Sequence, residues 1–265
     1  MQCRNLIGKL EELAPRRLAC DWDNPGLLAG WEDREIYRVL VALDATDVVV
    51  EQAVREQADL LLTHHPMIFK PLKQINDQSF TGRRLLDLIG HGISCYAMHT
   101  NFDIAPGCMA DLAAERLGLI DGVPLEVTGE EDGKPVGIGK VGLLREPVTL
   151  KKLAQQVKEA FGIPFVTVYG METGEGPVSR VAISPGSGGS MLRYGIAAGA
   201  QVLVTGDIGH HEGIDAVADH MAVIDAGHYG LEHIFIPFIK DYLEQVSGRE
   251  LEVITAAPAF PAVTV

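Results

Sequence analysis

The sequence predicts an α/β fold of two duplicated βα lobes, in which mostly parallel sheets are flanked by helices. Two observations lead to this fold class. Short apolar runs rich in branched residues alternate with amphipathic stretches of helical periodicity throughout the 265 residues. The two halves of the chain also resemble one another, so the same strand–helix–strand unit is expected in each. Strands joined through helices in this way favour open sheets with many parallel strands.

The first half contains three runs that predict buried strands, over 39–43, 59–63 and 93–98. Helices are expected after Thr46, which is suited to cap one, over 83–91 with Gly92 as a stop, and over 109–118. Residues 1–15 have apolar residues at helical spacing without a long apolar core, which predicts a surface helix and not a signal peptide. No run approaches the roughly 18 apolar residues of a membrane span.

The second half is expected to begin after a polar turn or linker over 126–135. Its expected strands are 137–144, 164–170, 180–184, 201–205, 222–226 and 251–255. Its expected helices are 149–161, which starts at Thr149 and stops at Gly162, 190–198, 211–219 and 231–246. This organisation predicts a first α/β lobe over residues 1–130 and a second over 131–265.

An internal repeat supports the two lobes. Arg38 begins a strand that leads, 21 residues later, to Asp59 and the run Leu-Leu-Leu-Thr; Arg180 begins a strand that leads, 21 residues later, to Gln201 and Val-Leu-Val-Thr. The offset is 142 (180 − 38), so Thr63 aligns with Thr205. Chance similarity between two Val-rich βα units is the alternative that remains open.

The third strands of the two halves align at a shorter offset. His99-x-x-x-Asp103 follows the first of them and His228-x-x-x-Glu232 follows the second. The offset between these motifs is 129 (228 − 99), and the 13 missing residues are expected to be an extra loop in the first half, around 70–80.

Charge and cysteine content restrict the function classes. The net charge is −14 with a pI near 5.0, which disfavours nucleic-acid binding because the chain repels phosphate backbones on average. The four cysteines form no Cys-x-x-Cys pair, and we expect reduced thiols in the cytoplasm. They are Cys3, Cys20, Cys95 and Cys108.

Histidines and acids follow the predicted strands. Ligands of open α/β sheets gather beyond the carboxyl ends of the strands, and nitrogen and carboxylate donors there predict a site for Zn, Mn or Fe. The adjacent His64 and His65 cannot easily chelate one ion, but each can serve one of two neighbouring ions. Asp103 and Glu232 are suited to bridge such a pair, and His228 completes the set. The sequence therefore predicts two divalent ions per chain.

Ordinary structural roles are the alternatives for these residues. A His-His pair can belong to a turn, His99 can be a satisfied core histidine, and His228 with Glu232 can be a simple helix start. Their joint occurrence at matching strand ends favours the metal site.

Other motifs carry weaker signals. The glycines of 137–142 match a dinucleotide fingerprint in spacing but open no helix, so we reject that interpretation. Residues 185–190 join a strand to a helix and are either an anion cradle or a plain flexible turn. Cys108 near His99 is a weak candidate for a thiol–His pair, and no nucleophile elbow supports Ser-His-Asp catalysis.

Five motifs, in order along nearly the whole chain, give a specific resemblance. They are DWDNPGLLAG (21–30), LTHHPMIF (62–69), MHTNFD (98–103), VTGDIGHHEGIDA (204–216) and IDAGHYGLE (224–232). The sequence resembles the short form of the Nif-three-like family, whose members are often labelled GTP cyclohydrolase type-two homologues. It departs from the family at 108–111, where Cys-Met-Ala-Asp replaces a Gly-Val-Asn-Asp-like turn.

The resemblance implies a two-lobed α/β fold in a toroidal homohexamer with dinuclear sites facing its cavity. Carried over by motif, the ligands are His64, His65, Asp103, His228 and Glu232. His99 and His211 are then close neighbours that orient ligands or relay protons in catalysis.

Two classes of function follow from these features. The first is a metal-dependent hydrolase acting on a small molecule, such as a purine nucleotide, as the cyclohydrolase label suggests. The second is a non-catalytic, ring-shaped metal-binding scaffold or regulatory protein. DNA binding inside a ring is disfavoured by the negative charge, and no membrane association is expected.

Overall fold

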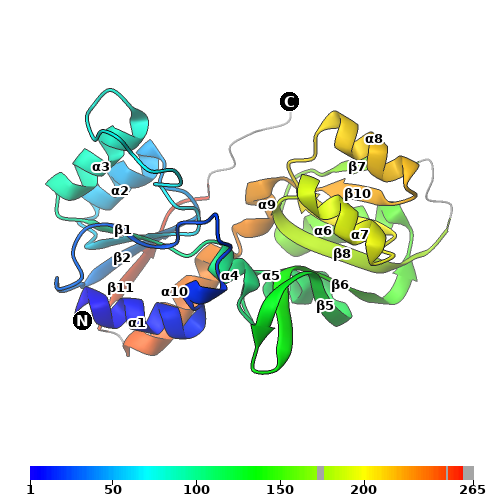
Figure 1. The fold of residues 1–265 in the computed structure, drawn as a ribbon, viewed down its shortest axis with the longest axis horizontal. Helices are drawn as coiled ribbons and strands as arrows, with labels where there is room; N and C mark the ends of the chain where they lie inside the picture. The colour runs from blue at the N-terminus through cyan, green and yellow to red at the C-terminus, as the bar shows by residue number, and fades with distance from the viewer. Residues whose placement is uncertain (172–175, 249, 259–265) are drawn as a thin grey trace. The chain divides into compact units, whose positions relative to one another are not determined.

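The chain forms two compact units in a computed structural model that describes residues 1–171, 176–248 and 250–258 (Figure 1). Unit 1 consists of Met1–Phe102 and Phe235–Pro258, and unit 2 contains Asp103–Ile234. Within residues 1–258 the chain therefore passes between the units at two points, whereas the repeat suggested one division near residue 130. The second crossing arises because the last helix and strand return to the first sheet.

Unit 1 is built on a five-stranded sheet. In spatial order its strands are β1 (Gly26–Ala29), β4 (Ser94–Ala97), β3 (Leu60–Thr63), β2 (Arg38–Ala42) and β11 (Glu252–Thr255). Four of them are parallel, as predicted, and β1 pairs with β4 in the antiparallel direction. The short β1 was not expected, because its four residues lie between turn-forming residues, Pro25 and Gly30.

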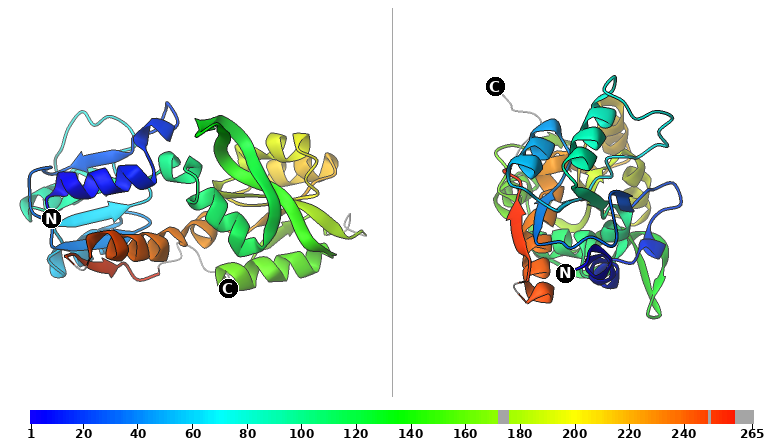
Figure 2. Two further views of the ribbon diagram at one scale, coloured as in Figure 1. Left: turned by 90° about the horizontal axis from the view of Figure 1, so that it is seen from below. Right: turned by 90° about the vertical axis from the view of Figure 1, so that its left-hand side faces the viewer.

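Helices cover both faces of this sheet. They are α1 (Cys3–Leu13), α2 (Asp47–Arg55), α3 (Phe80–Gly90) and α10 (Phe235–Ser247), with a short 3-10 turn η1 (Arg16–Leu18). Helices α2 and α3 lie on one face and α1 and α10 on the other (Figures 1 and 2). The Tyr242 hydroxyl of α10 donates to the Lys9 carbonyl of α1 at 2.6 Å. Thr46 caps α2 as predicted, accepting from the Val49 amide at 3.3 Å.

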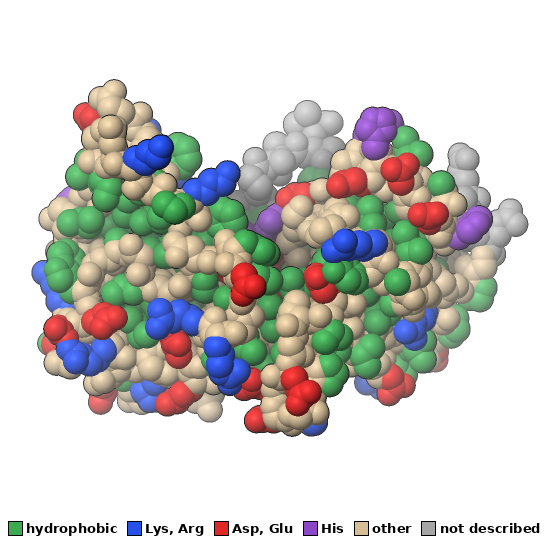
Figure 3. Space-filling view, in the orientation of Figure 1, with side chains coloured by type: hydrophobic (Ala, Val, Ile, Leu, Met, Phe, Trp, Pro, Cys, Tyr) green, Lys and Arg blue, Asp and Glu red, His purple; other side chains and the backbone are tan. Residues whose placement is uncertain are grey.

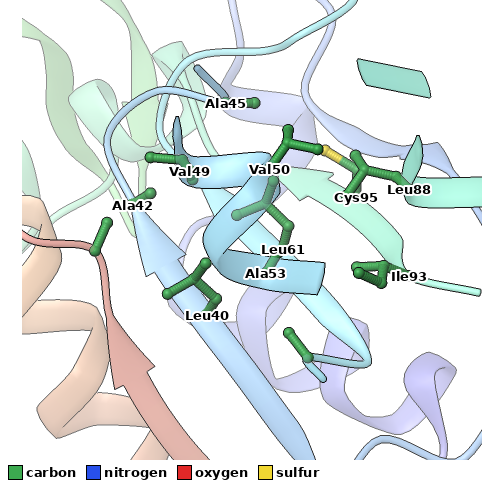
Figure 4. Close-up of a cluster of buried hydrophobic side chains, with 12 residues drawn as sticks. Leu40, Ala42, Ala45, Val49, Val50, Ala53, Leu61, Leu88, Ile93 and Cys95 are labelled. Atoms are coloured by element: carbon green, nitrogen blue, oxygen red, sulfur yellow. The ribbon is translucent and has the colours of Figure 1, made fainter. Parts of the chain in front are cut away.

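The apolar faces of α2 and α3 form one side of the core of unit 1. In Figure 4, Val50 of α2 lies beside Cys95 of β4 and Leu88 of α3. Leu40 and Leu61, from β2 and β3, complete the layer beneath α2. All five side chains are buried, so this packing fixes the positions of the strand ends that carry the candidate site.

Unit 2 is built on a six-stranded mixed sheet. In spatial order its strands are β5 (Leu119–Glu131), β6 (Lys134–Val148), β8 (Val178–Ser187), β9 (Val202–Gly206), β10 (Ala222–Asp225) and β7 (Thr167–Tyr169). Only β8, β9 and β10 are parallel to one another. Of the polar turn or linker expected over 126–135, the turn is confirmed and the linker is wrong, because these residues form the β5–β6 hairpin. Its two-residue turn, Asp132-Gly133, has φ values of 50° and 74°, which an Asp-Gly pair readily adopts.

The described helices of unit 2 are α5 (Met109–Leu117), α6 (Leu150–Phe161), α7 (Leu192–Ala197), preceded by the 3-10 turn η2 (Gly189–Met191), α8 (His210–Ala218) and α9 (His228–Glu232). The first four of these helices, α5 to α8, begin and end within two residues of the predicted ranges. Thr149 caps α6, and Gly162 ends it with a φ of 64°, both as predicted. The single helix expected over 231–246 is instead α9 followed by α10. A further short helix, α4 (Thr100–Ile104), contains the first crossing between the units.

The internal repeat is confirmed by strand register. Val39 pairs with Leu60 in unit 1, and Val181 pairs with Val202 in unit 2, so both positions differ by 142. The third strands of the repeat, β4 and β10, also occupy matching places beside β3 and β9.

The register of the third strands corrects the motif alignment by one residue. Leu60 pairs with Ser94 and Val202 pairs with Ala222, so the offset is 128 (222 − 94) and not 129. His228 therefore corresponds to Thr100, and both residues are the first of a short helix.

Candidate metal centre

Three histidines form a cluster at the carboxyl ends of β3 and β4 in unit 1. Thr63, the last residue of β3, pairs with Ala97, the last residue of β4, so the segments that follow leave the sheet side by side. His64, His65 and His99 lie in these segments, with one potential ligand atom from each within 4.8 Å of the others. We call these three residues the histidine group.

Each ring of the histidine group is anchored through Nδ1. The acceptors are the Met98 carbonyl oxygen for His64 at 2.7 Å and the Asp44 carboxylate for His65 at 2.8 Å. A carbonyl or an ionised carboxylate can only accept a hydrogen bond, so the proton lies on Nδ1 and Nε2 carries the lone pair. This is the tautomer in which an imidazole binds a metal through Nε2, with its outer partner fixing the ring.

His99 is also anchored through Nδ1, and its anchor, Asp23, is itself held by further hydrogen bonds. Its Nδ1 lies 2.7 Å from Asp23, whose other carboxylate oxygen accepts from the Thr100 amide at 3.0 Å and the Thr100 hydroxyl at 2.5 Å. Burial raises the pKa of the Asp23 carboxyl, but the hydrogen bonds from His99 and Thr100 outweigh it and lower the pKa to about 2. Asp23 is therefore ionised at neutral pH.

A second pair of donors lies at the carboxyl end of β10 in unit 2. Gly227, with a φ of 74°, turns the chain into α9, which begins at His228 and ends at Glu232. One helical turn separates these residues, and His228 Nε2 lies 3.0 Å from Glu232 Oε2. His228 Nδ1 is anchored 2.7 Å from Asp207 Oδ2, so this ring also directs Nε2 toward the other donor.

Glycines allow the backbone to approach this pair closely. A Cβ on Gly186 would lie 2.6 Å from Glu232 Oε1, and a Cβ on Gly206 would lie 2.5 Å from the His228 amide nitrogen. Gly186 also has a φ of 84°, which L side chains rarely adopt. The three glycines of the 185–190 segment are explained by its close approach to Glu232, Thr205 and Glu212, whether or not the segment binds an anion.

The remaining predicted site residues lie on helices. Asp103 is partly exposed on α4, four residues after His99. His211 is exposed in the first turn of α8, with its ring 5.2 Å from that of His210. Among the described residues, no group of three or more close donors includes His211.

Sequence reasoning missed the anchors more than the donors. Asp44 and Asp207 are single acids after predicted strands, and Asp23 lies within the motif of residues 21–30, so nothing local in the sequence marks any of them as an anchor. The Asp23–His99 pair spans 76 residues, so periodicity and spacing gave no signal for it.

The donor set fits a divalent transition metal. Imidazole nitrogens with carboxylate oxygens are the ligands that Zn, Mn and Fe ions take in proteins. The anchoring of each ring by a carboxylate or a carbonyl is the arrangement that surrounds such ligands. We conclude that unit 1 carries a group of three histidines, and unit 2 a His–Glu pair, whose donor types are suited to metal binding.

Comparison with known proteins identifies the family. The family model described as Duf34/NIF3 (NGG1p interacting factor 3) matches residues 1–258. The chain belongs to the Duf34/NIF3 family. In the described part of this family member, no helix has the length and apolar character needed to cross a membrane.

Relatives and solved structures agree with this assignment. A Streptococcus pneumoniae protein named GTP cyclohydrolase 1 type 2 homolog is 36% identical over 247 residues, covering 92% of this chain and 91% of its own. A Schizosaccharomyces pombe protein named Protein NIF3 homolog is 30% identical over 262 residues, covering 95% and 91%. The crystal structure of a Bacillus cereus protein related to NIF3 superposes with a TM-score of 0.89 at 23% identity, covering 100% and 99%. This last likeness shows the fold of the NIF3 family.

Proposed function

We propose that this chain is a dinuclear metal-dependent hydrolase whose substrate is a purine nucleotide or a related heterocycle. The proposed ligands are those predicted from the sequence: His64, His65, Asp103, His228 and Glu232. The observation that carries the proposal is the anchoring of His64, His65 and His228, each through Nδ1, so that Nε2 is the coordinating nitrogen. The names of relatives as GTP cyclohydrolase homologues support a nucleotide as the substrate.

Two of the proposed ligands lie close in sequence to the points where the chain passes from one unit to the other. The first crossing lies between Phe102 and Asp103, and the second between Ile234 and Phe235. Asp103 is therefore at one crossing, and Glu232 is two residues before the other. Only three residues separate Asp103 from His99 in the sequence.

Two divalent ions of the Zn, Mn or Fe type would supply a Lewis acid that polarises a substrate oxygen and lowers the pKa of a water molecule. The chain supplies proton transfer and orientation. His99 carries its proton on Nδ1 against the ionised Asp23, so Nε2 is available to accept a proton from a reacting group. Asp23 then stabilises the resulting imidazolium. His211 is the other predicted proton carrier, and its exposed position on α8 makes it the weaker of the two candidates.

Metal content and turnover test this proposal together. The purified chain, loaded with Zn²⁺, Mn²⁺ or Fe²⁺, is assayed against a library of nucleotides and phosphoesters. We expect metal-dependent turnover that His64→Ala abolishes. Because His64 is buried and its removal can unfold the chain, Glu232→Gln provides an isosteric second variant that removes the charge alone.

A matched control uses a histidine outside the proposed site. His91 is exposed at the end of α3, where its Nδ1 lies 2.8 Å from the Asp87 carbonyl. His91→Ala should keep both the metal content and the turnover of the unmodified chain. Absence of metal-dependent turnover across the library, or full turnover in Glu232→Gln, would refute the hydrolase.

A non-catalytic metal-binding ring is the second candidate, and the NIF3 family resemblance is what favours it. We propose a homohexamer for either function. Size-exclusion chromatography with and without a chelator separates the two: a structural metal predicts that the ring falls apart on chelation. Tight metal retention without turnover would favour the scaffold over the hydrolase.

Charge and cysteine state bear on the remaining proposals. On the face drawn in Figure 3, Lys and Arg side chains are interspersed with Asp and Glu and form no continuous basic patch. Together with the net charge of −14, this surface disfavours DNA as a partner, and a gel shift at low salt tests for DNA binding.

No disulfide joins the four cysteines, which supports the proposed location in the cytoplasm.

A further inference from the structure

Two exposed aromatic side chains lie beside the histidine group in unit 1. Trp22 is 59% exposed and Phe69 is 45% exposed. Their ring centroids are 5.9 Å apart, and they lie 6.1 Å and 6.3 Å from the ring centroid of His99. The planes of Trp22 and Phe69 are tilted by 59°, so the two rings do not stack on each other. We call these two residues the aromatic pair.

Hydrogen bonds hold the two segments that carry the aromatic pair. Trp22 directly precedes Asp23, which is fixed by His99 and Thr100. Phe69 follows Ile68, whose carbonyl accepts from the Asn24 side-chain amide at 2.6 Å. The segment of Trp22 is therefore held by Asp23, which also anchors His99, and the segment of Phe69 is held by the neighbouring Asn24.

Exposed aromatic rings at a fixed position indicate a ligand. Large aromatic side chains usually bury most of their surface, and those left open beside polar groups mark binding sites. Trp22 and Phe69 present apolar surface next to nitrogen donors, which suits a molecule with a flat apolar part and a polar part. A flat ring can stack on one aromatic face and meet the edge of the other, as the tilt between these rings allows.

We propose that the aromatic pair binds the planar heteroaromatic ring of the substrate and holds its reacting atoms toward the histidine group. This inference rests on the proposed function and gives that function its ring-binding residues. It does not involve phosphate recognition, because neither ring offers a charge. Trp22 supplies the larger stacking surface, and Phe69 meets the edge of the bound ring.

Fluorescence of Trp22 reports directly on this contact. The chain has two tryptophans, and Trp31 lies apart from the histidine group, with Arg34 4.8 Å over its ring. Trp31→Phe therefore leaves Trp22 as the only tryptophan. This variant is titrated with guanosine and, separately, with ribose 5-phosphate, both without metal and with Zn²⁺. We expect saturable quenching by guanosine and none by ribose 5-phosphate.

Phe69→Ala in the Trp31→Phe background should weaken guanosine binding about tenfold, since one of the two ring contacts is lost. Phe80→Ala is the matched control, because Phe80 is also an exposed phenylalanine of unit 1 but contacts Arg84 instead. Phe80→Ala should leave the guanosine affinity unchanged. Both replaced rings are exposed, so both variants are expected to fold.

The outcomes separate this inference from the proposed function. Saturable quenching without any turnover supports the aromatic pair and counts against the hydrolase. Turnover that is unchanged in Phe69→Ala, or absence of quenching with and without Zn²⁺, overturns the aromatic pair and leaves the hydrolase standing. If Trp22 emission instead changes with protein concentration and not with guanosine, a second copy of the chain covers the pair, and the inference is wrong.

Discussion

Gly186 offers a sharp test of the Glu232 position, because an alanine there would have two separable effects. The first is backbone strain: Gly186 has a φ of 84°, and an L residue in the left-handed region costs about 1–2 kcal/mol. The second is a collision, because the new Cβ would lie 2.6 Å from Glu232 Oε1, closer than real Cβ contacts come. The carboxylate must then shift by several tenths of an ångström.

Gly199 allows the two effects to be separated. Its φ is 67°, but a Cβ built there meets nothing within 4 Å. Gly199→Ala should therefore lower the free energy of unfolding by about 1–2 kcal/mol and leave metal binding unchanged. Gly186→Ala should show at least the same loss of stability and, in addition, a metal affinity lowered roughly 10–100-fold, the usual effect of disturbing the surroundings of a ligand.

Urea denaturation of the metal-free variants gives the stability, and isothermal titration with Zn²⁺ gives the affinity. The comparison is made on the metal-free chain because bound metal would itself add to stability. Equal Zn²⁺ affinities for Gly186→Ala and Gly199→Ala would show that the approach of Gly186 to Glu232 has no bearing on metal binding. The assignment of Glu232 as a ligand would then lose its support from this contact.

Three further predictions concern buried polar groups. Thr205→Val removes a hydroxyl that donates to a β8 carbonyl at 2.7 Å, and should lower the free energy of unfolding by about 1–3 kcal/mol in urea denaturation. The pKa of Asp23 is lowered to about 2, so its ionised carboxylate stabilises the metal-free chain above pH ~4, and this stabilisation is lost as the pH falls toward 2. Thermal melts of Asp23→Asn should lack this pH dependence. Burial raises the pKa of Cys3 to about 11 and that of Cys95 to about 12, so a thiol reagent at pH 8 should label them only after unfolding.

Local signals in the sequence predicted the parallel core of both units. Thr46 and Thr149 cap their helices, and Gly162 ends one, because a cap is decided by a few adjacent residues. Apolar runs such as 39–43 predicted buried strands because both faces of a covered parallel sheet are apolar. The antiparallel strands were harder to predict. In the β5–β6 hairpin, apolar residues are interrupted by polar ones, so its sequence resembles a linker.

Long-range pairings limited what the sequence could predict. Strand β11 lies beside β2 although more than 200 residues separate them, as the pairing of Val253 with Val39 shows. No local pattern encodes that return of the chain, and it determines where the compact units divide. The candidate donors were easier to find than their anchors, because histidines at strand ends can be read in order whereas Asp23 meets His99 only through the fold.

Both units anchor a histidine through a carboxylate on a neighbouring strand end, but they do so at different strands of the repeat. This difference explains why aligning the two His-x-x-x-acid motifs gives an offset one residue larger than the strand register does. In unit 1, Asp44 beyond β2 anchors His65 beyond the neighbouring β3. In unit 2, Asp207 takes the position of His65, 142 residues later, and anchors His228 beyond the neighbouring β10. In both units, a carboxylate beyond one strand thus orients an imidazole beyond the neighbouring strand. In unit 2 this carboxylate–imidazole pair lies one strand further along the repeat than in unit 1. The His-x-x-x-acid spacing is shared, whereas the backbone position of the histidine is not. We therefore expect His99 and His228 to differ in role, and the anchors, rather than the spacing, to define which nitrogens bind metal.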